Sequence, residues 1–118
     1  MKPELMFINN EWVSSISKAT RDITDPASGE LLAKVPESNK DDMERAIQAA
    51  RNAFDHGPWK NSLALDRSKL LLKVADGIRA RSKEFAELET KNCGKPLAEA
   101  EFDVGDAANC FEFYAGLL

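Results

Sequence analysis

The sequence contains few of the residues and patterns on which most catalytic sites depend. Its 118 residues include two cysteines and one histidine, too few ligands for a zinc site. Its six glycines form no GxG pair, so these residues carry neither a dinucleotide-binding glycine turn nor a P-loop. No apolar run approaches the roughly 20 residues that span a bilayer, and no signal-peptide core follows the first residues. We therefore expect a reduced, cytoplasmic protein without a membrane anchor.

The composition is that of a globular protein of at most one ordinary domain. Apolar residues make up 43% and charged residues 31%, which excludes a disordered chain. The net charge of -4 argues against nucleic acid as a partner, because phosphate binding needs a basic surface.

Short strands are predicted in the first third of the chain. Residues 6–13 predict a β-hairpin with an asparagine-rich turn. Residues 21–24 and 31–35 predict two more strands, separated by the turn signal of residues 25–29.

Three amphipathic helices are predicted after the strands. The first follows a cap at Ser38 or Asn39 and ends near residues 56–58, and the second begins near residues 62–66 with a break near Arg81-Ser82, where Ser82 can cap a fresh segment. The third follows Pro96. As it stands the sequence is α+β, yet no continuous Val/Ile-rich strand of a buried parallel sheet accompanies the helices, so they lack a partner layer. Its last three residues are not polar, and we expect the sequence to be part of a longer one.

The joint at residues 88–96 separates the last two helical patterns. Gly94 suits the left-handed residue that closes a helix, and Pro96 the first turn of the next. Cys93 lies beside Lys95, which could lower a thiol pKa, so the joint is either a reactive site or a structural turn. A nucleophile also needs a base and an oxyanion site, and neither is visible, so we expect no catalytic residue within this chain.

Two aspartates on the last predicted helix are the other candidates. Asp103 and Asp106 are three residues apart, so they project from the same side of the helix. Such a pair is either an ordinary solvated face or an electrostatic attraction for a cationic ligand.

Several separate segments, in order, resemble the N-terminus of the NAD(P)-dependent aldehyde dehydrogenases. The C-terminal part, residues 92–116, is most similar to the betaine-aldehyde and aminoaldehyde branch. The segments that carry the resemblance are Phe7 to Trp12, Asp25 to Glu30, Ala46 to Phe54, Leu70 to Asp76, Leu88 to Thr90 and Gly94 to Pro96.

The resemblance implies a complete chain of about 500 residues, several domain lengths, with a Rossmann-like coenzyme domain, a catalytic domain and an oligomerisation flap. Residues 1–118 would be the outer, N-terminal part of the α/β coenzyme domain, without the catalytic domain. The family reaction is thiolate attack on the aldehyde, hydride transfer to NAD(P)+ and hydrolysis of the thioester. The family's nucleophile, general base, oxyanion-hole asparagine and coenzyme glycine turn would all lie beyond Leu118.

Two family sites fall within the chain according to the same resemblance. A monovalent cation, K+ or Na+, would bind main-chain oxygens near Ile23 and Thr24 and the residue that matches Asn92, where many members have aspartate. Acids that match Asp103 and Asp106 would lie at the mouth of the substrate channel, where they favour aldehydes with a distant ammonium or trimethylammonium group.

The sequence thus predicts the N-terminal part of an aldehyde dehydrogenase that acts on amino or betaine aldehydes with NAD(P)+, inactive by itself. Complete members are homo-oligomers with a small aldehyde as substrate. The alternative is a non-catalytic module that binds intact subunits or another protein.

Overall fold

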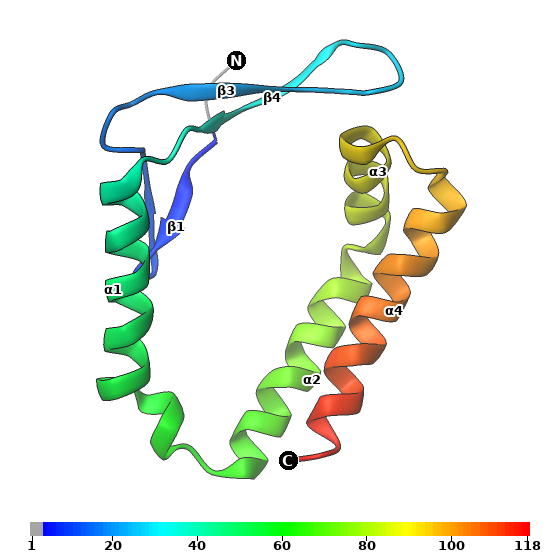
Figure 1. Ribbon diagram of the computed structural model, residues 1–118. Helices are drawn as coiled ribbons and strands as arrows, with labels where there is room; N and C mark the ends of the chain where they lie inside the picture. The colour runs from blue at the N-terminus through cyan, green and yellow to red at the C-terminus, as the bar shows by residue number, and fades with distance from the viewer. Residues whose placement is uncertain (1–3) are drawn as a thin grey trace. The chain divides into compact units, whose positions relative to one another are not determined.

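The computed structural model describes residues 4–118, which form two antiparallel sheets of two strands each and four α-helices (Figure 1). The expected α+β content is confirmed. The contacts divide the chain into two compact units. The first unit comprises residues 1–24 and 29–60, and the second comprises residues 25–28 and 61–118.

The first sheet of unit 1 is the predicted hairpin of β1 (Met6–Ile8) and β2 (Glu11–Val13). Asn9 and Asn10 both have positive φ, 54° and 64°, as a two-residue turn between twisted strands requires. Phe7 and Trp12 are directly opposite each other, with ring centroids 4.9 Å apart.

The second sheet pairs β3 (Thr20–Thr24) with β4 (Leu31–Pro36). The predicted strands are confirmed, except that Pro36 belongs to β4 and lies opposite Thr20. The register shifts between Ile23 and Thr24. Such a bulge leaves backbone groups out of the ladder.

Helix α1 (Lys40–His56) begins at the predicted capping box. The Asn39 side chain accepts a hydrogen bond from the Asp42 N–H at 3.0 Å, and the Asp42 carboxylate accepts one from the Asn39 N–H at 3.2 Å. Of the two caps that the sequence allowed, Asn39 is the one used. The helix ends at Gly57, and a short 3-10 helix, η1 (Pro58–Asn61), follows.

The expectation of three helices is wrong by one, because the second is divided at Arg81 into α2 (Ala64–Ala80) and α3 (Ser82–Cys93). The break lies at the predicted place. Arg81, with φ -116° and ψ 18°, occupies the cap position of both helices, and Ser82 is already helical. Ser82 therefore does not cap α3 as expected. None of the described helices is long and apolar enough to cross a membrane.

Helix α4 (Leu97–Ala115) packs along α2 and α3 (Figure 1). The buried apolar residues of the described chain are all alanines of the second unit: Ala75, Ala86, Ala100, Ala108 and Ala115. Small side chains allow close helix contact but bury little apolar area, so this core contributes little of the hydrophobic stabilisation that a larger core provides.

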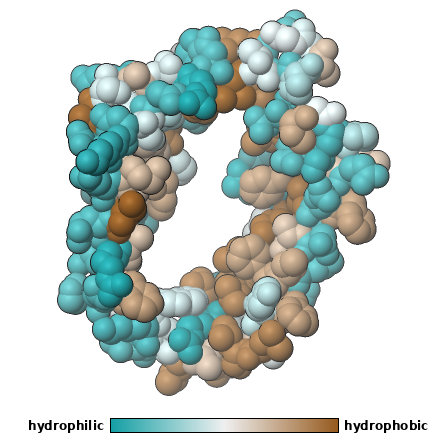
Figure 2. Space-filling view, viewed as in Figure 1, coloured by the Kyte–Doolittle hydropathy of each residue, from teal (hydrophilic) through white to brown (hydrophobic). Residues whose placement is uncertain are grey.

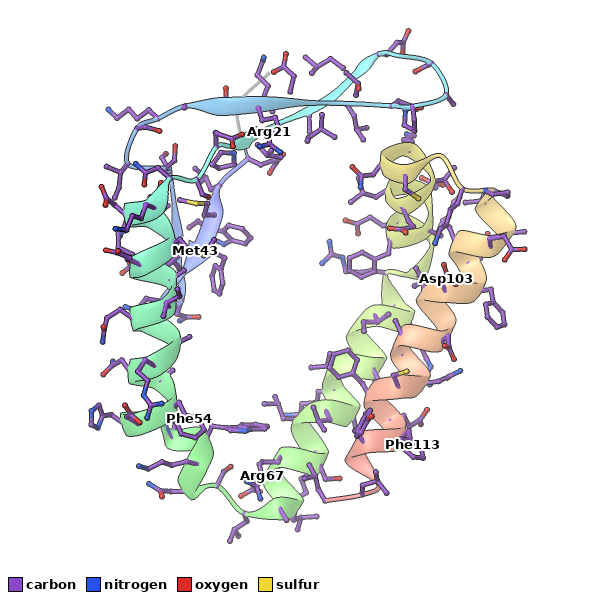
Figure 3. The ribbon with its side chains drawn as sticks, viewed as in Figure 1. Arg21, Met43, Phe54, Arg67, Asp103 and Phe113 are labelled. Carbon is purple, nitrogen blue, oxygen red and sulfur yellow. The ribbon has the colours of Figure 1, made fainter. Side chains whose placement is uncertain are left out.

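Large apolar side chains remain exposed in both units. On α1, one of the helices expected to be amphipathic, the large apolar side chains of Met43 and Phe54 (Figure 3) are 56% and 68% exposed. In the second unit, apolar side chains gather over α2 and the end of α4 (Figure 2). The amphipathic patterns are therefore real, but the described residues provide no layer that covers them.

Candidate functional site

The joint between α3 and α4 is a helix stop followed by a restart. Gly94 is left-handed, with φ 80° and ψ 12°, and its N–H donates to the Thr90 carbonyl at 2.8 Å. A Cβ at Gly94 would come within 2.9 Å of Pro26 Cγ, so both backbone and space require glycine. Pro96 is the cap residue of α4, one position before its first turn. The joint thus fixes where α4 begins.

The geometry does not activate Cys93. The thiol is exposed, and the hydrogen bond that it makes goes to Glu89 Oε1 at 3.7 Å. Within residues 4–118, no basic side chain is a partner of this thiol. The other cysteine, Cys110, is exposed on α4.

Lys95 instead joins the two helices. Its ammonium contacts Asp103 Oδ2 on α4 and lies 3.2 Å from Glu89 Oε1 on α3. The hydrogen bond that the Lys95 ammonium donates to Asp103, followed by the one that it donates to Glu89, raises the pKa of Lys95, so the side chain is fully protonated at neutral pH. Asp103 is therefore a paired carboxylate near the start of α4 (Figure 3).

Asp106 differs from Asp103 in its surroundings. It is exposed one turn further along α4, and within residues 4–118 no ion pair reaches it. Helix α4 carries five acids and no basic residue. One face of α4 is exposed throughout and contains Glu99, Asp103, Asp106, Cys110 and Tyr114. Ala100, Ala108 and Ala115 of the same helix are buried.

The residues expected to bind a monovalent cation belong to separate units. Ile23 and Thr24 lie in the first unit, where the register between β3 and β4 shifts. Asn92 is exposed in the last turn of α3 in the second unit. Among residues 4–118 no cluster of three His, Cys, Asp or Glu side chains could hold a metal ion.

The described residues do not fit a dinucleotide. Such a site needs a parallel strand that leads through a glycine-rich turn into a helix, whereas both sheets here are antiparallel pairs. Residues 4–118 therefore contain no such strand–turn–helix unit.

Sequence reasoning missed the ion pairs that join distant segments. Lys95 and Asp103 are eight residues apart across a non-helical joint, and Arg79 on α2 pairs with Glu112 on α4 at 2.5 Å. Neither spacing follows the i,i+4 rule of a single helix. The stop at Gly94 and restart at Pro96 were the available signal for the first pair.

A family model described as the aldehyde dehydrogenase family matches residues 12–118. The chain is 43% identical over 114 residues to betaine aldehyde dehydrogenase of Bacillus subtilis (strain 168), covering 97% of this chain and 23% of that protein. It is 38% identical to the peroxisomal aminoaldehyde dehydrogenase 1 of Malus domestica, covering 96% of this chain and 23% of that protein.

Solved structures give the same picture. A crystal structure of betaine aldehyde dehydrogenase from Staphylococcus aureus, in complex with NAD+, matches with a TM-score of 0.94 and 42% identity, covering 97% of this chain and 23% of that one. A NAD-dependent aldehyde dehydrogenase from Sinorhizobium meliloti matches with a TM-score of 0.93 and 38% identity, over 98% and 23% of the two chains. The chain thus spans about a quarter of the length of the proteins that it matches.

Proposed function

Because the chain belongs to the aldehyde dehydrogenase family, we propose that it forms the N-terminal part of an enzyme that oxidises amino or betaine aldehydes to carboxylic acids with NAD(P)+. The main observation in favour of a cationic substrate is the exposed acidic face of α4, a helix that contains no basic residue. The names of the betaine-aldehyde and aminoaldehyde relatives support the same class.

Residues 1–118 act in this proposal as the outer part of the coenzyme domain. The exposed apolar stripe of α1, with Met43, Ile47 and Phe54, is the face that a sheet from the rest of the enzyme would cover. Burying one such side chain stabilises a protein by about 1.5–3 kcal/mol, so the covering layer adds substantially to a core of alanines. NAD(P)+ and the nucleophile then belong to the remainder of the enzyme.

In the proposed enzyme, Asp103 and Asp106 lie at the mouth of the substrate channel. A carboxylate there attracts an aldehyde with a distant ammonium group and leaves a neutral aldehyde unaffected. The monovalent-cation site at Ile23, Thr24 and Asn92 stays a prediction of the same proposal; the amide of Asn92 supplies an oxygen ligand but no charge.

The proposal includes the oligomeric state and the cellular location that we expect from the sequence. We place the complete enzyme in the cytoplasm as a homo-oligomer. Relatives named as mitochondrial and peroxisomal show that the family itself works in several compartments.

The exposed apolar side chains favour one alternative, a non-catalytic module that binds intact subunits. Such a module would remain without activity when joined to the rest of a family enzyme. It would instead co-purify with a complete family enzyme.

The test uses a chimera in which residues 1–118 replace the matching segment of the Bacillus subtilis betaine aldehyde dehydrogenase. Changing Asp103 and Asp106 together to alanine should raise the Michaelis constant for betaine aldehyde and hardly change that for a neutral aliphatic aldehyde. Equal effects on both substrates would show that the acids are structural. Residues 1–118 alone serve as the negative control and should show no turnover with NAD+ and betaine aldehyde.

A further inference from the structure

Arg67 on α2 (Figure 3) differs from the other arginines of the described chain in having no ion pair. The arginines that pair with a carboxylate are Arg21, Arg45, Arg51, Arg79 and Arg81. Those five residues are exposed, whereas Arg67 is half-buried. Its Nε is buried without a hydrogen-bond partner. The least exposed arginine is thus the one whose charge is not neutralised.

The helix that carries Arg67 provides no acid to pair with it. Residues three and four positions away are its neighbours on a helix surface, and all of them are apolar: Leu63, Ala64, Leu70 and Leu71. Asp66 is adjacent in sequence and therefore faces another side of the helix.

Helix α4, which packs along α2, does not supply an acid either. The end of α4 reaches the first turns of α2, since Ser68 Oγ donates to the Ala115 carbonyl at 2.8 Å. The last acid of α4 is Glu112, which pairs with Arg79 at 2.5 Å, and residues 113–118 contain no acidic side chain. Within residues 4–118 the Arg67 guanidinium therefore has no anionic partner.

The apolar residues beside Arg67 are themselves uncovered. Leu63 and Leu70 are exposed, and apolar side chains gather over α2 (Figure 2). A layer that covers these leucines would bury Arg67 further, and a buried guanidinium is costly unless an anion pairs with it. The planar fork of arginine fits a carboxylate through two parallel N–H donors.

From these observations we infer that Arg67 is a docking residue for the rest of the proposed enzyme. A carboxylate from the segment that follows Leu118 in that enzyme pairs with the guanidinium, while apolar side chains of the same segment cover Leu63 and Leu70. The relatives are long enough to provide such a segment, since this chain covers 23% of the Bacillus subtilis protein. The inference rests on the proposed function and adds a specific contact to it.

A crystal structure of the chimera tests the inference directly. We expect a carboxylate oxygen from the part after residue 118 to lie within about 3 Å of the Arg67 guanidinium, as in a charge-assisted hydrogen bond. A guanidinium that faces solvent, a partner subunit or a phosphate of bound NAD+ would overturn the inference. The proposed function is decided separately, by whether the chimera oxidises cationic aldehydes.

Arg67→Met tests the pairing in solution. Methionine keeps an unbranched apolar stem but removes the charge, so the partner carboxylate would be left buried and alone. The midpoint of thermal inactivation of the chimera should fall by at least about 3 °C. Arg67→Lys keeps the charge but not the fork, so it should lower the midpoint less. The matched control Arg79→Met breaks an exposed pair on the same helix and should shift the midpoint by less than about 1 °C.

The direction of the change distinguishes the outcomes. If no anion meets Arg67, Arg67→Met replaces an unpaired charge with an apolar side chain, and an unchanged or higher midpoint would overturn the inference. If the anion is a coenzyme phosphate, Arg67→Met would raise the Michaelis constant for NAD+, which we expect to stay unchanged. If Arg67→Met yields no folded enzyme, Arg67→Lys is compared with Arg79→Lys, and equal shifts of the midpoint would contradict the docking role.

Discussion

The carboxylate of Asp42 accepts a hydrogen bond from the backbone N–H of Ile16 at 3.1 Å, which ties the loop after β2 to the first turn of α1. The same carboxylate accepts one from the Asn39 N–H at 3.2 Å, and its side chain is only 1% exposed. One carboxylate therefore holds both the start of the helix and the loop that connects the two sheets.

Asp42→Ala should destabilise the start of α1 by about 1–3 kcal/mol, since it leaves two N–H donors without a protein partner. Amide hydrogen exchange of the first turns of α1 would measure this as lost protection. The control is Asp41→Ala, an exposed acid of the same turn, which should cost no more than the helix-dipole effect of about 0.3–1 kcal/mol. Equal loss in both variants would contradict the role of Asp42.

Two glycines in unit 2 should respond oppositely to alanine. A Cβ at Gly77, inside α2, would meet nothing within 4 Å, so Gly77→Ala should stabilise the helix by about 1 kcal/mol. Gly94→Ala should destabilise the joint, because φ is 80° and the Cβ would lie 2.9 Å from Pro26 Cγ. Helical content by circular dichroism in a urea titration would show both effects, and a stabilised Gly94→Ala would contradict the described joint.

The residues around these glycines show how far the sequence can predict the fold. Local signals were sufficient where the structure uses local interactions: Asn39 with Asp42 at the start of α1, Gly94 at the end of α3, and the two asparagines of the first hairpin. The prediction that Ser82 caps α3 was wrong because Arg81, the residue before it, occupies the cap position. A residue that suits a cap does not act as one when it lies inside the helix.

The sequence was enough to predict which face of α4 carries the two aspartates, but not which of them is paired with a lysine. Periodicity was enough to place Asp103 and Asp106 on the exposed face of α4. It could not reveal that Lys95 pairs with Asp103, since that contact depends on the turn between two helices. The capping role of Asp42 was predictable, whereas its contact with Ile16, 26 residues away, depends on tertiary structure.

The exposed apolar stripe of α1 should make the isolated chain bind an environment-sensitive apolar dye. Replacing Ile47 and Phe54 with glutamine, both more than 60% exposed, should reduce dye fluorescence substantially. A control that changes Lys40 and Glu44, an exposed pair on the same helix, to glutamine should leave the fluorescence unchanged. Equal fluorescence from all three chains would show that the stripe is covered in solution.

The break between α2 and α3 should have a pH-dependent component. Hydrogen bonding from Arg81 lowers the pKa of Glu84 below its ordinary value of 4.5. The stabilisation is therefore fully present above pH 4.5 and is lost as the pH falls through the lower, folded-state pKa. In an NMR titration, Arg81→Gln should raise the pKa of Glu84, while the control Lys83→Gln should leave it unchanged; the reverse result would contradict the pairing.

The most direct test of the account is whether the chimera with the Bacillus subtilis enzyme oxidises betaine aldehyde. We expect the chimera to form NADH at a rate within about tenfold of the parent enzyme, a loss of no more than about 1.4 kcal/mol of transition-state stabilisation. We also expect loss of folded enzyme when Ile47 and Phe54 of the chimera are changed to asparagine. A chimera that folds and binds NAD+ but oxidises no aldehyde would contradict the claim that this chain forms part of a working aldehyde dehydrogenase.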